Sequence, residues 1–435
     1  MTDLRRNRYS ISAGVGKSVL DSLGKFYGSP KRQLPNKFEA GKEYTGYNAP
    51  WIPFALDWLK QGKYSSEWIA MGSLNEEPNN MIQLLKLITG DDGNSHLEKA
   101  QAATDLEYPV TKLLWNPSSV GSNTDSQLLA STDQQLRLWK TDFEAGIDSP
   151  LLCQASLSTH VKTHNNAPLT SFDWCKTDPS YIVVSSLDTT CTVWDIVAQQ
   201  SKTQLIAHDK EVYDVAFLKD SINVFVSVGA DGSVRMFDLR SLDHSTIIYE
   251  GDSTFWKRNG DYTNASPPVS APLLRLSACD SDVNLMATFH HNSSDVQMID
   301  IRVPGTAYAT LRGHKGDVNA VKWMPGSKSK LATCGDDCVV SLWDLDQPVN
   351  PSPAPTLSVS GTTPGMTGST SEYVTPVSSV NSMRETASPL NADNQYSPLL
   401  SWKLEHEVNN LSWSVKNDGL AVVYGKSLEI LKVPQ

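Results

Sequence analysis

The chain has few cysteines, the residues that cross-link small secreted domains or bind structural zinc. Only six cysteines occur among its 435 residues, at positions 153, 175, 191, 279, 334 and 338. No two of them form a CxxC pair, so the sequence contains neither the density of a disulfide framework nor a zinc half-site of that type. A reducing, intracellular setting is the simplest interpretation.

Long apolar runs and excess positive charge are also missing. No stretch approaches 18 consecutive apolar residues, which excludes an ordinary transmembrane helix. The formal net charge of -11 argues against a nucleic-acid-binding surface, because such surfaces need clustered Lys and Arg. Residues 1–42 are the exception, with nine Lys/Arg against three Asp/Glu. We therefore expect no direct nucleic-acid partner and no membrane partner.

What the chain has instead is an internal repeat. An aspartate precedes an aromatic residue by six positions four times, in the pairs Asp133/Trp139, Asp188/Trp194, Asp231/Phe237 and Asp337/Trp343. In the last three pairs a second aspartate follows the aromatic residue directly, and in two of these a histidine lies 30 residues before that aspartate. A repeat of about 40–45 residues that ends in Trp-Asp indicates a β-propeller.

Hydrophobic strand-like segments end each repeat unit. Seven of them occur, at residues 81–85, 136–139, 192–194, 234–237, 296–299, 340–343 and 428–431. The sequence therefore predicts an all-β fold, a seven-bladed WD40 β-propeller over residues 43–435. Residues 43–47 are expected to add a strand to the last blade and so join the two ends of the ring.

Three segments do not fit a packed propeller. Residues 1–42 predict a disordered basic tail, and the polar segment 251–270 predicts a surface loop. Residues 347–398 are rich in Ser, Thr and Pro and predict a long disordered loop that leaves the ring after the sixth unit. The chain is then expected to return for the seventh unit at about Trp402.

That long loop contains five Ser-Pro or Thr-Pro pairs. They make candidate sites of proline-directed phosphorylation, where added charge could create an arginine-binding surface. Pairs of this kind also arise from composition alone, so both interpretations stay open. The candidates are Ser352, Thr363, Thr375, Ser388 and Ser397.

The repeated polar residues match a structural role. They correspond to the hydrogen-bonded tetrad of a WD-repeat blade, in which aspartate, histidine, a Ser/Thr hydroxyl and a Trp indole are linked. Buried polar groups are tolerated when they are fully partnered, which explains the fixed spacing. One unit supplies His314, Thr333, Asp337 and Trp343, and a second supplies His208, Ser227 and Asp231 with Phe237 in place of Trp.

Other units depart from this pattern. The units around Asp133 and Asp188 are interpreted as one residue shorter before the aspartate, which predicts partial tetrads. The unit that ends at Ile299 has Ser293 where an aspartate is expected. Recurrence of His–Asp pairs across blades is typical of scaffolding rather than of acid–base catalysis.

No other motif predicts chemistry. Residues 14–18 resemble the end of a phosphate-binding loop, but its first glycine would fall on Ile11. The paired histidines His290 and His291, and the pair Cys334 and Cys338, have no second pair at metal-ligand spacing. We therefore expect a non-enzymatic protein with no catalytic residues, no metal site and no cofactor.

Several segments go beyond the general repeat pattern. Residues 202–217, 227–240 and 242–250, together with 169–174, 186–194 and 428–433, closely resemble a WD-repeat adaptor family. That family includes plant TRANSPARENT TESTA GLABRA and the animal partner of DYRK-type kinases. The resemblance covers roughly residues 48–346 and 400–433, and the basic tail and both insertions lie outside it.

The resemblance implies a scaffold of cytoplasm and nucleus that binds protein kinases or transcription regulators, with the propeller itself monomeric. Some animal members also resemble substrate receptors of cullin-RING ubiquitin ligases, which is the alternative function. The associated motif is Asp-x-Arg at the end of the third strand of two successive blades, here Asp238/Arg240 and Asp300/Arg302. The planar guanidinium of arginine can make two hydrogen bonds to a partner at once, which suits docking. The simpler interpretation is that each arginine pairs with an acidic neighbour on its own blade.

Overall fold

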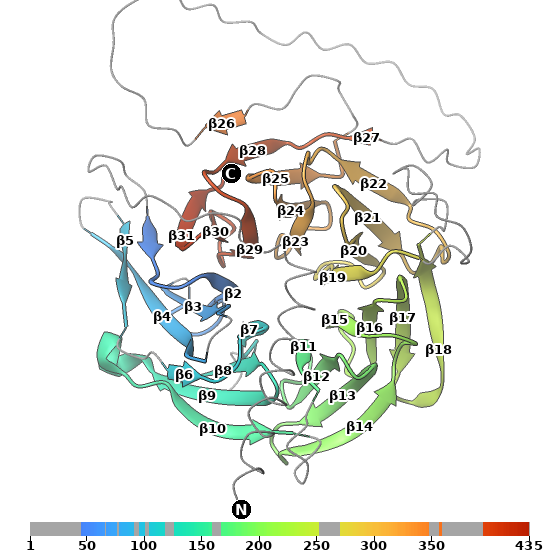
Figure 1. Cartoon of the computed structure of the whole chain (residues 1–435), viewed down its shortest axis with the longest axis horizontal. Helices are drawn as coiled ribbons and strands as arrows, with labels where there is room; N and C mark the ends of the chain where they lie inside the picture. Colours follow the sequence, from blue (N-terminus) through green and yellow to red (C-terminus); the bar gives the residue numbers. More distant parts are fainter. Residues whose placement is uncertain are drawn as a thin grey trace, which may run out of the picture.

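The computed structural model is a ring of seven β-sheets (Figure 1). The prediction of a seven-bladed WD40 β-propeller is confirmed. The structure describes residues 45–434 except for 66, 76–77, 91–94, 101–103, 118–125, 159–166, 252–269, 348–355 and 359–394. The predicted tail 1–42 lies outside the described residues.

Blades 1 to 4 follow the chain, and each begins with its innermost strand. Blade 1 contains β2 (Pro53–Trp58), β3 (Trp68–Ser73), β4 (Asn80–Thr89) and β5 (Ser95–Lys99), with β6 (Thr104–Leu106) also paired to β4. Blade 2 contains β7 (Lys112–Trp115), β8 (Ser126–Thr132), β9 (Leu136–Asp142) and β10 (Leu152–Leu157). Blade 3 contains β11 (Leu169–Trp174), β12 (Tyr181–Ser186), β13 (Thr190–Asp195) and β14 (Gln200–Ile206). Blade 4 contains β15 (Val212–Phe217), β16 (Val224–Gly229), β17 (Ser233–Asp238) and β18 (Ser241–Glu250).

Blades 5 to 7 include strands that are distant in the chain. Blade 5 contains β19 (Leu273–Ala278), β20 (Leu285–His290), β21 (Asp295–Asp300), β22 (Ala309–Arg312) and β27 (Gln395–Tyr396). Blade 6 contains β23 (Val318–Trp323), β24 (Lys330–Gly335), β25 (Val339–Asp344), β28 (Leu400–Lys403) and β26 (Thr356–Ser358). Blade 7 contains β29 (Val408–Trp413), β30 (Gly419–Tyr424), β31 (Ser427–Lys432) and β1 (Gly46–Asn48).

A strand from the start of the described chain closes the ring. β1 pairs antiparallel with β31, so that Gly46 lies opposite Glu429 and Tyr47 opposite Leu428. The closing strand begins at Gly46, later than the predicted segment 43–47, and residues 43–44 lie outside the described part. β1 is thus the outer strand of blade 7, and the two ends of the described chain are joined in one sheet.

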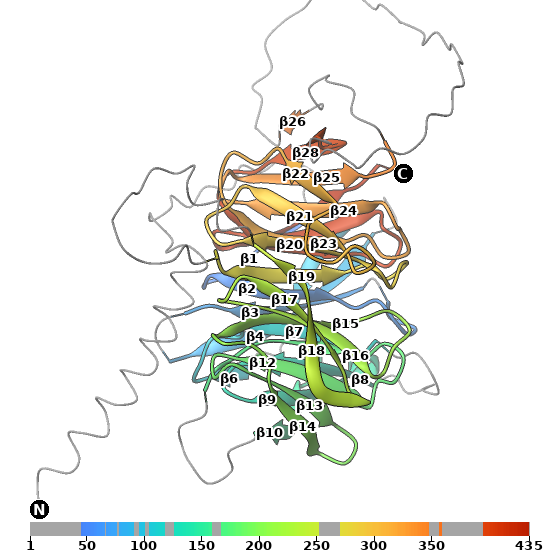
Figure 2. The same cartoon turned by 90° about the vertical axis from the view of Figure 1, so that its right-hand side faces the viewer.

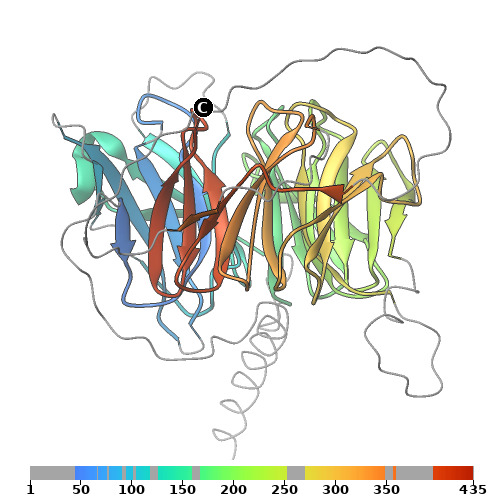
Figure 3. The same cartoon turned by 90° about the horizontal axis from the view of Figure 1, so that it is seen from above.

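The ring has two loop-bearing faces, between which the strands run (Figures 2 and 3). We name the top face by the loops that join second to third strands and one blade to the next. The bottom face carries the loops that join first to second and third to fourth strands. Within the described residues, no helix is long and apolar enough to cross a membrane.

The long insertion lies within a blade. β25 is the third strand of blade 6 and β28 is its fourth, so the insertion separates two strands of one sheet. The expectation that it follows the sixth blade was wrong, and Trp402 belongs to blade 6 rather than to blade 7. The reason is that the Trp-Asp signal ends a repeat at the third strand, one strand before the blade ends. The other predicted loop, 251–270, joins β18 to β19 between blades 4 and 5, and its residues 252–269 lie outside the described part.

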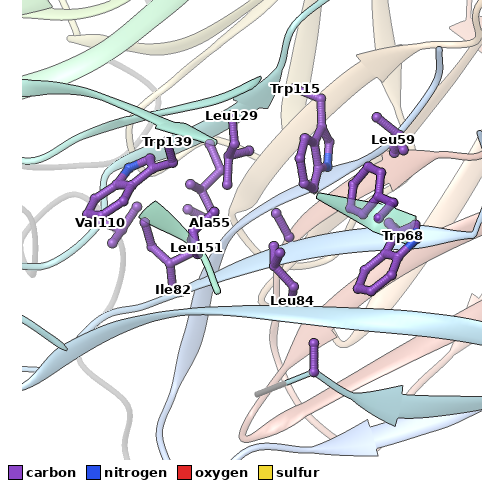
Figure 4. Close-up of a cluster of buried hydrophobic side chains, with 14 of the residues drawn as sticks. Ala55, Leu59, Trp68, Ile82, Leu84, Val110, Trp115, Leu129, Trp139 and Leu151 are labelled. Atoms are coloured by element: carbon purple, nitrogen blue, oxygen red, sulfur yellow. The ribbon is translucent and has the colours of Figure 1, made fainter. Parts of the chain in front are cut away.

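Hydrophobic clusters between neighbouring blades form the core. The cluster shared by blades 1 and 2 contains Trp68, Trp115 and Trp139 (Figure 4). Phe143, in the 3-10 segment η1 (Phe143–Asp148), stacks on Trp68 with ring centroids 4.6 Å apart. Every residue of β2 and β15 is buried, because an inner strand packs against blades on both sides. Side-chain burial of this extent is the main stabilising contribution to the ring.

Polar side chains on the inner strands tie the blades together. Each one accepts a hydrogen bond from a backbone N–H of a neighbouring blade. The N–H groups and their acceptors are Trp115 to Asp57 at 2.9 Å, Phe217 to Asp173 at 2.7 Å, Leu276 to Asp214 at 2.9 Å, Trp323 to Ser277 at 3.1 Å and Trp58 to Ser412 at 3.1 Å. These bonds satisfy buried N–H groups that have no partner within their own sheet.

Candidate docking site on blades 4 and 5

The blade 6 residues of the predicted tetrad are brought together. Nδ1 of His314 lies 3.0 and 3.1 Å from the carboxylate oxygens of Asp337, and its Nε2 lies 2.7 Å from the Thr333 hydroxyl. The Trp343 indole donates to the same hydroxyl at 2.8 Å. Because a carboxylate only accepts, Nδ1 of His314 carries the donated proton. The chain of contacts links the top-face turn to the third strand of the blade.

The blade 4 residues form the same network without the indole. His208 lies 2.9 Å from Asp231 through Nδ1 and 2.7 Å from Ser227 through Nε2. Phe237, which has no donor, stacks on Phe225 with ring centroids 5.0 Å apart. Burial raises the pKa of Asp231, but the hydrogen bond and charge of His208 outweigh it, and the net pKa lies below its usual range.

Blades 2 and 3 depart from the expected spacing in different ways. In blade 6 Thr333 pairs with Ser341 and seven residues, 334–340, lie between them. In blade 2 Ser131 and Arg137 pair around only five residues, 132–136, and Trp139 still donates to Ser131 at 2.8 Å.

Blade 3 keeps the full hairpin length. Val184 pairs with Thr192 around seven residues, 185–191, so Val184 occupies the hydroxyl position. The interpretation that this unit is one residue shorter was wrong. In blade 2 the hairpin is two residues shorter than in blade 6. Ser185, next to that position, has its hydroxyl 2.9 Å from that of Thr170 instead.

Blade 5 uses a different buried network. Nδ1 of His290 donates to the Ala271 carbonyl at 2.9 Å, and in the neutral ring its Nε2 accepts from the Tyr249 hydroxyl at 3.0 Å. Burial lowers the pKa of His290, which favours the neutral ring. Ser293, at the expected aspartate position, accepts from the backbone N–H of Asp295 at 3.1 Å. All of these networks are buried, so they hold the ring together and do not form a contact surface.

The two Asp-x-Arg motifs lie on the bottom face, at the ends of β17 and β21. Asp238 and Asp300 end these strands, and Arg240 and Arg302 follow in the turns to the outer strands. Each arginine makes a two-point contact with the aspartate of its own motif. The Nε distances are both 2.9 Å, and the Nη2 distances are 2.6 Å for Arg240 and 2.5 Å for Arg302.

These pairs set the electrostatics of the rim. The hydrogen bond from Arg240 lowers the pKa of Asp238 to about 2, and that from Arg302 lowers the pKa of Asp300. The side chains of Arg240 and Arg302 are 68% and 60% exposed. Exposed ion pairs contribute little to stability, so these two contribute little to holding the blades.

The equivalent aspartates of blades 3 and 6 show what this aspartate does in a turn that has no arginine. In blade 3 Asp195 accepts from the backbone N–H groups of Val197 and Ala198 at 3.0 and 2.9 Å, and in blade 6 Asp344 accepts from that of Asp346 at 3.1 Å. The carboxylate therefore caps the turn in blades 3 to 6. Arginine two positions later occurs only in blades 4 and 5 of these four. The arginines are the feature that the turn itself does not require.

Exposed apolar side chains occur in the same two blades as the arginines. Leu242, Ile247 and Val303 are 45%, 48% and 55% exposed. A parallel bridge between Tyr249 and Gly305 joins the two blades, whereas Ile247 pairs with Arg235, farther along β17 from the Asp-x-Arg motif. Sequence reasoning missed these residues, because exposed apolar positions on an outer strand give no periodic signal. Leu242 and Val303 lie within two residues of Arg240 and Arg302, and we name the surface of these four residues the blade 4–5 rim.

The remaining sequence candidates are placed as follows. Within the described residues, no three His, Cys, Asp or Glu side chains gather in a way that could hold a metal ion. Cys334 is buried among hydrophobic residues, and burial raises the pKa of its thiol. The glycine-rich segment 14–18 lies outside the described residues, and so do Ser352, Thr363, Thr375 and Ser388. Ser397 is described and is exposed.

Comparison with known proteins identifies the repeats and the family of this chain. The family model "WD domain, G-beta repeat" matches residues 199–238 and 305–344, which end at the third strands of blades 4 and 6. The chain is 36% identical over 398 residues to "DDB1- and CUL4-associated factor 7 homolog" of Dictyostelium discoideum, covering 91% of this chain and 100% of that protein. This chain belongs to the WD-repeat family of DDB1- and CUL4-associated factor 7.

Two further relatives share part or most of the chain. "WD repeat-containing protein YPL247C" of Saccharomyces cerevisiae is 34% identical, with 89% of this chain and 76% of that protein covered. "E3 ubiquitin-protein ligase COP1" of Arabidopsis thaliana is 24% identical, over 52% of this chain and 30% of that protein. The prediction of a WD-repeat adaptor is therefore confirmed at the level of the family.

The main functional prediction is contradicted. The sequence-based interpretation ranked the binding of kinases or transcription regulators above a ligase role. The Dictyostelium relative, matched over its whole length, is named for association with DDB1 and CUL4. That finding favours the interpretation that the sequence analysis had placed second. Asp-x-Arg is only three residues long, and within the sequence nothing ranks ligase docking above the other roles that the resemblance implies.

Proposed function

We propose that this protein is a non-enzymatic substrate receptor of a CUL4–DDB1 ubiquitin ligase, and that the blade 4–5 rim docks the ligase adaptor. Two arginines at equivalent positions of neighbouring blades support this most directly, because the turn chemistry does not require them. The name of the Dictyostelium relative supplies the partner. We further propose that the protein works in both cytoplasm and nucleus.

The geometry suits an exchange of hydrogen-bond partners. Each guanidinium is held in a defined orientation by its own aspartate, yet more than half of the arginine side chain is exposed. A planar fork held in this way loses little rotamer freedom when it binds a carboxylate or backbone carbonyl of a partner. The exposed side chains of Leu242 and Val303 would then be buried in the contact and add to the binding free energy.

Reversing both charges tests the docking role. We expect Arg240→Glu combined with Arg302→Glu to weaken binding of purified DDB1 by at least about 100-fold, because the glutamates would face Asp238 and Asp300 and repel acidic partner groups. Isothermal titration calorimetry measures the affinity. Circular dichroism and the melting temperature should stay close to those of the unchanged chain, since both side chains are exposed.

A matched variant controls for net charge. Lys416→Glu combined with Lys432→Glu makes the same total change on exposed positions of blade 7, on the other side of the ring. It should bind DDB1 normally. If the arginine variant keeps an affinity within about threefold of the unchanged chain, the rim is not the docking site and the arginines are only turn residues.

A further inference from the structure

The end of the long insertion lies along the outside of blade 5 and passes to blade 6 (Figure 1). β27 pairs with β22 in parallel, with Thr310 opposite Gln395 and Leu311 opposite Tyr396. The N–H of Leu399 then donates to the Leu342 carbonyl of blade 6 at 2.7 Å. Residues 395–399 therefore form a strap across the junction of the two blades.

The register of the strap places Ser397 beside Arg312. Tyr396 lies opposite Leu311, and Pro398 lies against Gly313, where an added Cβ would stand 3.2 Å from the proline Cγ. Ser397, which lies between Tyr396 and Pro398, is therefore beside Arg312. Neighbouring strands are about 5 Å apart, and residues at the same register of parallel strands point to the same side. Both side chains are exposed.

Arg312 has capacity for a second anion. Its Nε donates to Asp295 at 3.3 Å, and its side chain is 42% exposed. Among the residues that the structure describes, Asp295 is the acceptor found for this guanidinium, which leaves the two Nη groups to face solvent. A guanidinium carries five N–H donors in a planar fork, so a phosphate can take the Nη edge while Asp295 keeps Nε.

We propose that Ser397 is a site of proline-directed phosphorylation and that its phosphate binds Arg312 and fastens the strap to blade 5. Pro398 provides the proline that such kinases require at the next position. A proline-directed kinase transfers the γ-phosphoryl group of ATP to Ser397 Oγ. The new O–P bond forms, the bond from the γ-phosphorus to the bridging oxygen breaks, the hydroxyl proton is lost and ADP leaves.

The unmodified strap is accessible to such a kinase. β27 has only two residues, so its pairing to β22 opens at little cost and presents Ser397 in an extended segment. Once added, the phosphate carries a charge of about -1.5 to -2 at neutral pH. Asp295 repels the phosphate. Two charge-assisted hydrogen bonds from the Nη groups of Arg312 outweigh this repulsion, because Asp295 is already paired with Nε of the same guanidinium. The strap then stays closed.

Hydrogen exchange measured by mass spectrometry tests the proposal. The full chain is treated with a purified proline-directed kinase and ATP, and the modified positions are mapped. We expect phosphate on Ser397 and an exchange rate for residues 395–400 that is roughly threefold to tenfold slower than in the untreated chain. Arg312→Gln should still be phosphorylated at Ser397 and should lose the slowing.

Matched variants separate this site from the other candidates. Ser388→Ala removes a neighbouring Ser-Pro site of the same insertion and should leave the slowing intact, whereas Ser397→Ala should abolish it. Lys328→Gln removes an exposed charge from blade 6 and should change nothing at the strap. The proposal is overturned if Ser397 stays unmodified while Ser388 is modified, or if phosphate on Ser397 leaves the exchange unchanged or makes it faster. Neither result bears on docking at the blade 4–5 rim.

Discussion

Replacing Asp214 by alanine is expected to lower the free energy of unfolding by about 3–5 kcal/mol, the usual cost of leaving a buried charge without its partner. Asp214 lies on the inner strand β15, and its side chain is 4% exposed. Lys112, from blade 2, lies 3.1 Å away, and its side chain is 13% exposed. Without Asp214, this lysine has no carboxylate at that distance in a largely buried site.

Asp214 also binds groups on two further blades. It accepts from the Ser171 hydroxyl of blade 3 at 2.5 Å and from the backbone N–H of Leu276 in blade 5 at 2.9 Å. One carboxylate therefore links blades 2, 3, 4 and 5 across the inside of the ring. Urea denaturation followed by tryptophan fluorescence measures the loss. Asp243→Ala, at an exposed aspartate of the same blade, should change stability little.

The same residue predicts an acid-dependent part of the stability. Burial alone would raise the pKa of Asp214, but the charges of Lys112 and Arg275 and the Ser171 hydroxyl outweigh it and bring the pKa to about 2. A lowered pKa contributes stability above the ordinary value near 4, and this contribution is lost as the pH falls from about 4 to about 2. It amounts to about 2 kcal/mol.

Asp214→Asn isolates that contribution, because an amide of similar shape does not titrate. Between about pH 4 and pH 2 the stability of this variant should fall less steeply than that of the unchanged chain. The difference between the two free energies of unfolding should therefore shrink as the pH is lowered. A difference that stays constant over this range would mean that Asp214 is not held ionised by Lys112.

Much of the ring could be predicted from sequence because its signal repeats. The Asp-to-aromatic spacing recurs in four blades, and a hydrophobic segment ends each of the seven units, so seven third strands were recognisable. Blade membership of Trp402 was not predictable in the same way. A fourth strand has no Trp-Asp signal, and the insertion separates it from the strand it pairs with.

The candidate site was predictable only in part. Arg240 and Arg302 could be named because two identical short motifs lie in successive units. Leu242 and Val303 could not, since exposed apolar residues of an outer strand and a turn have no recurring spacing, and the bridge between blades 4 and 5 joins Tyr249 and Gly305, which are far apart in the chain. Contacts between residues distant in the chain leave no local spacing pattern. The inter-blade acceptors, such as Asp57 and Ser412, were missed for the same reason.

Asp337→Ala is expected to lower the free energy of unfolding by about 2–4 kcal/mol, because buried donors would be left without acceptors. Asp337 accepts from His314 and from the backbone N–H groups of Lys315 and Val339 at 2.9 and 3.1 Å. Urea denaturation measures the loss, and Asp346→Ala, at an exposed position of the same blade, serves as the control.

The equivalent change in blade 4, Asp231→Ala, also removes a contact with an arginine. Asp231 also binds Arg235, whose Nη2 lies 3.0 Å away, but Arg235 has Asp209 as a second partner at 2.6 Å. Arg235 therefore stays paired in Asp231→Ala, and the loss comes mainly from His208 and Ser233. Both variants should be destabilised, while Asp337→Asn should keep part of the stability because an amide oxygen still accepts from Nδ1 of His314. If Asp337→Ala were as stable as the Asp346 control, the blade 6 tetrad would not stabilise the ring, and its fixed spacing would need another cause.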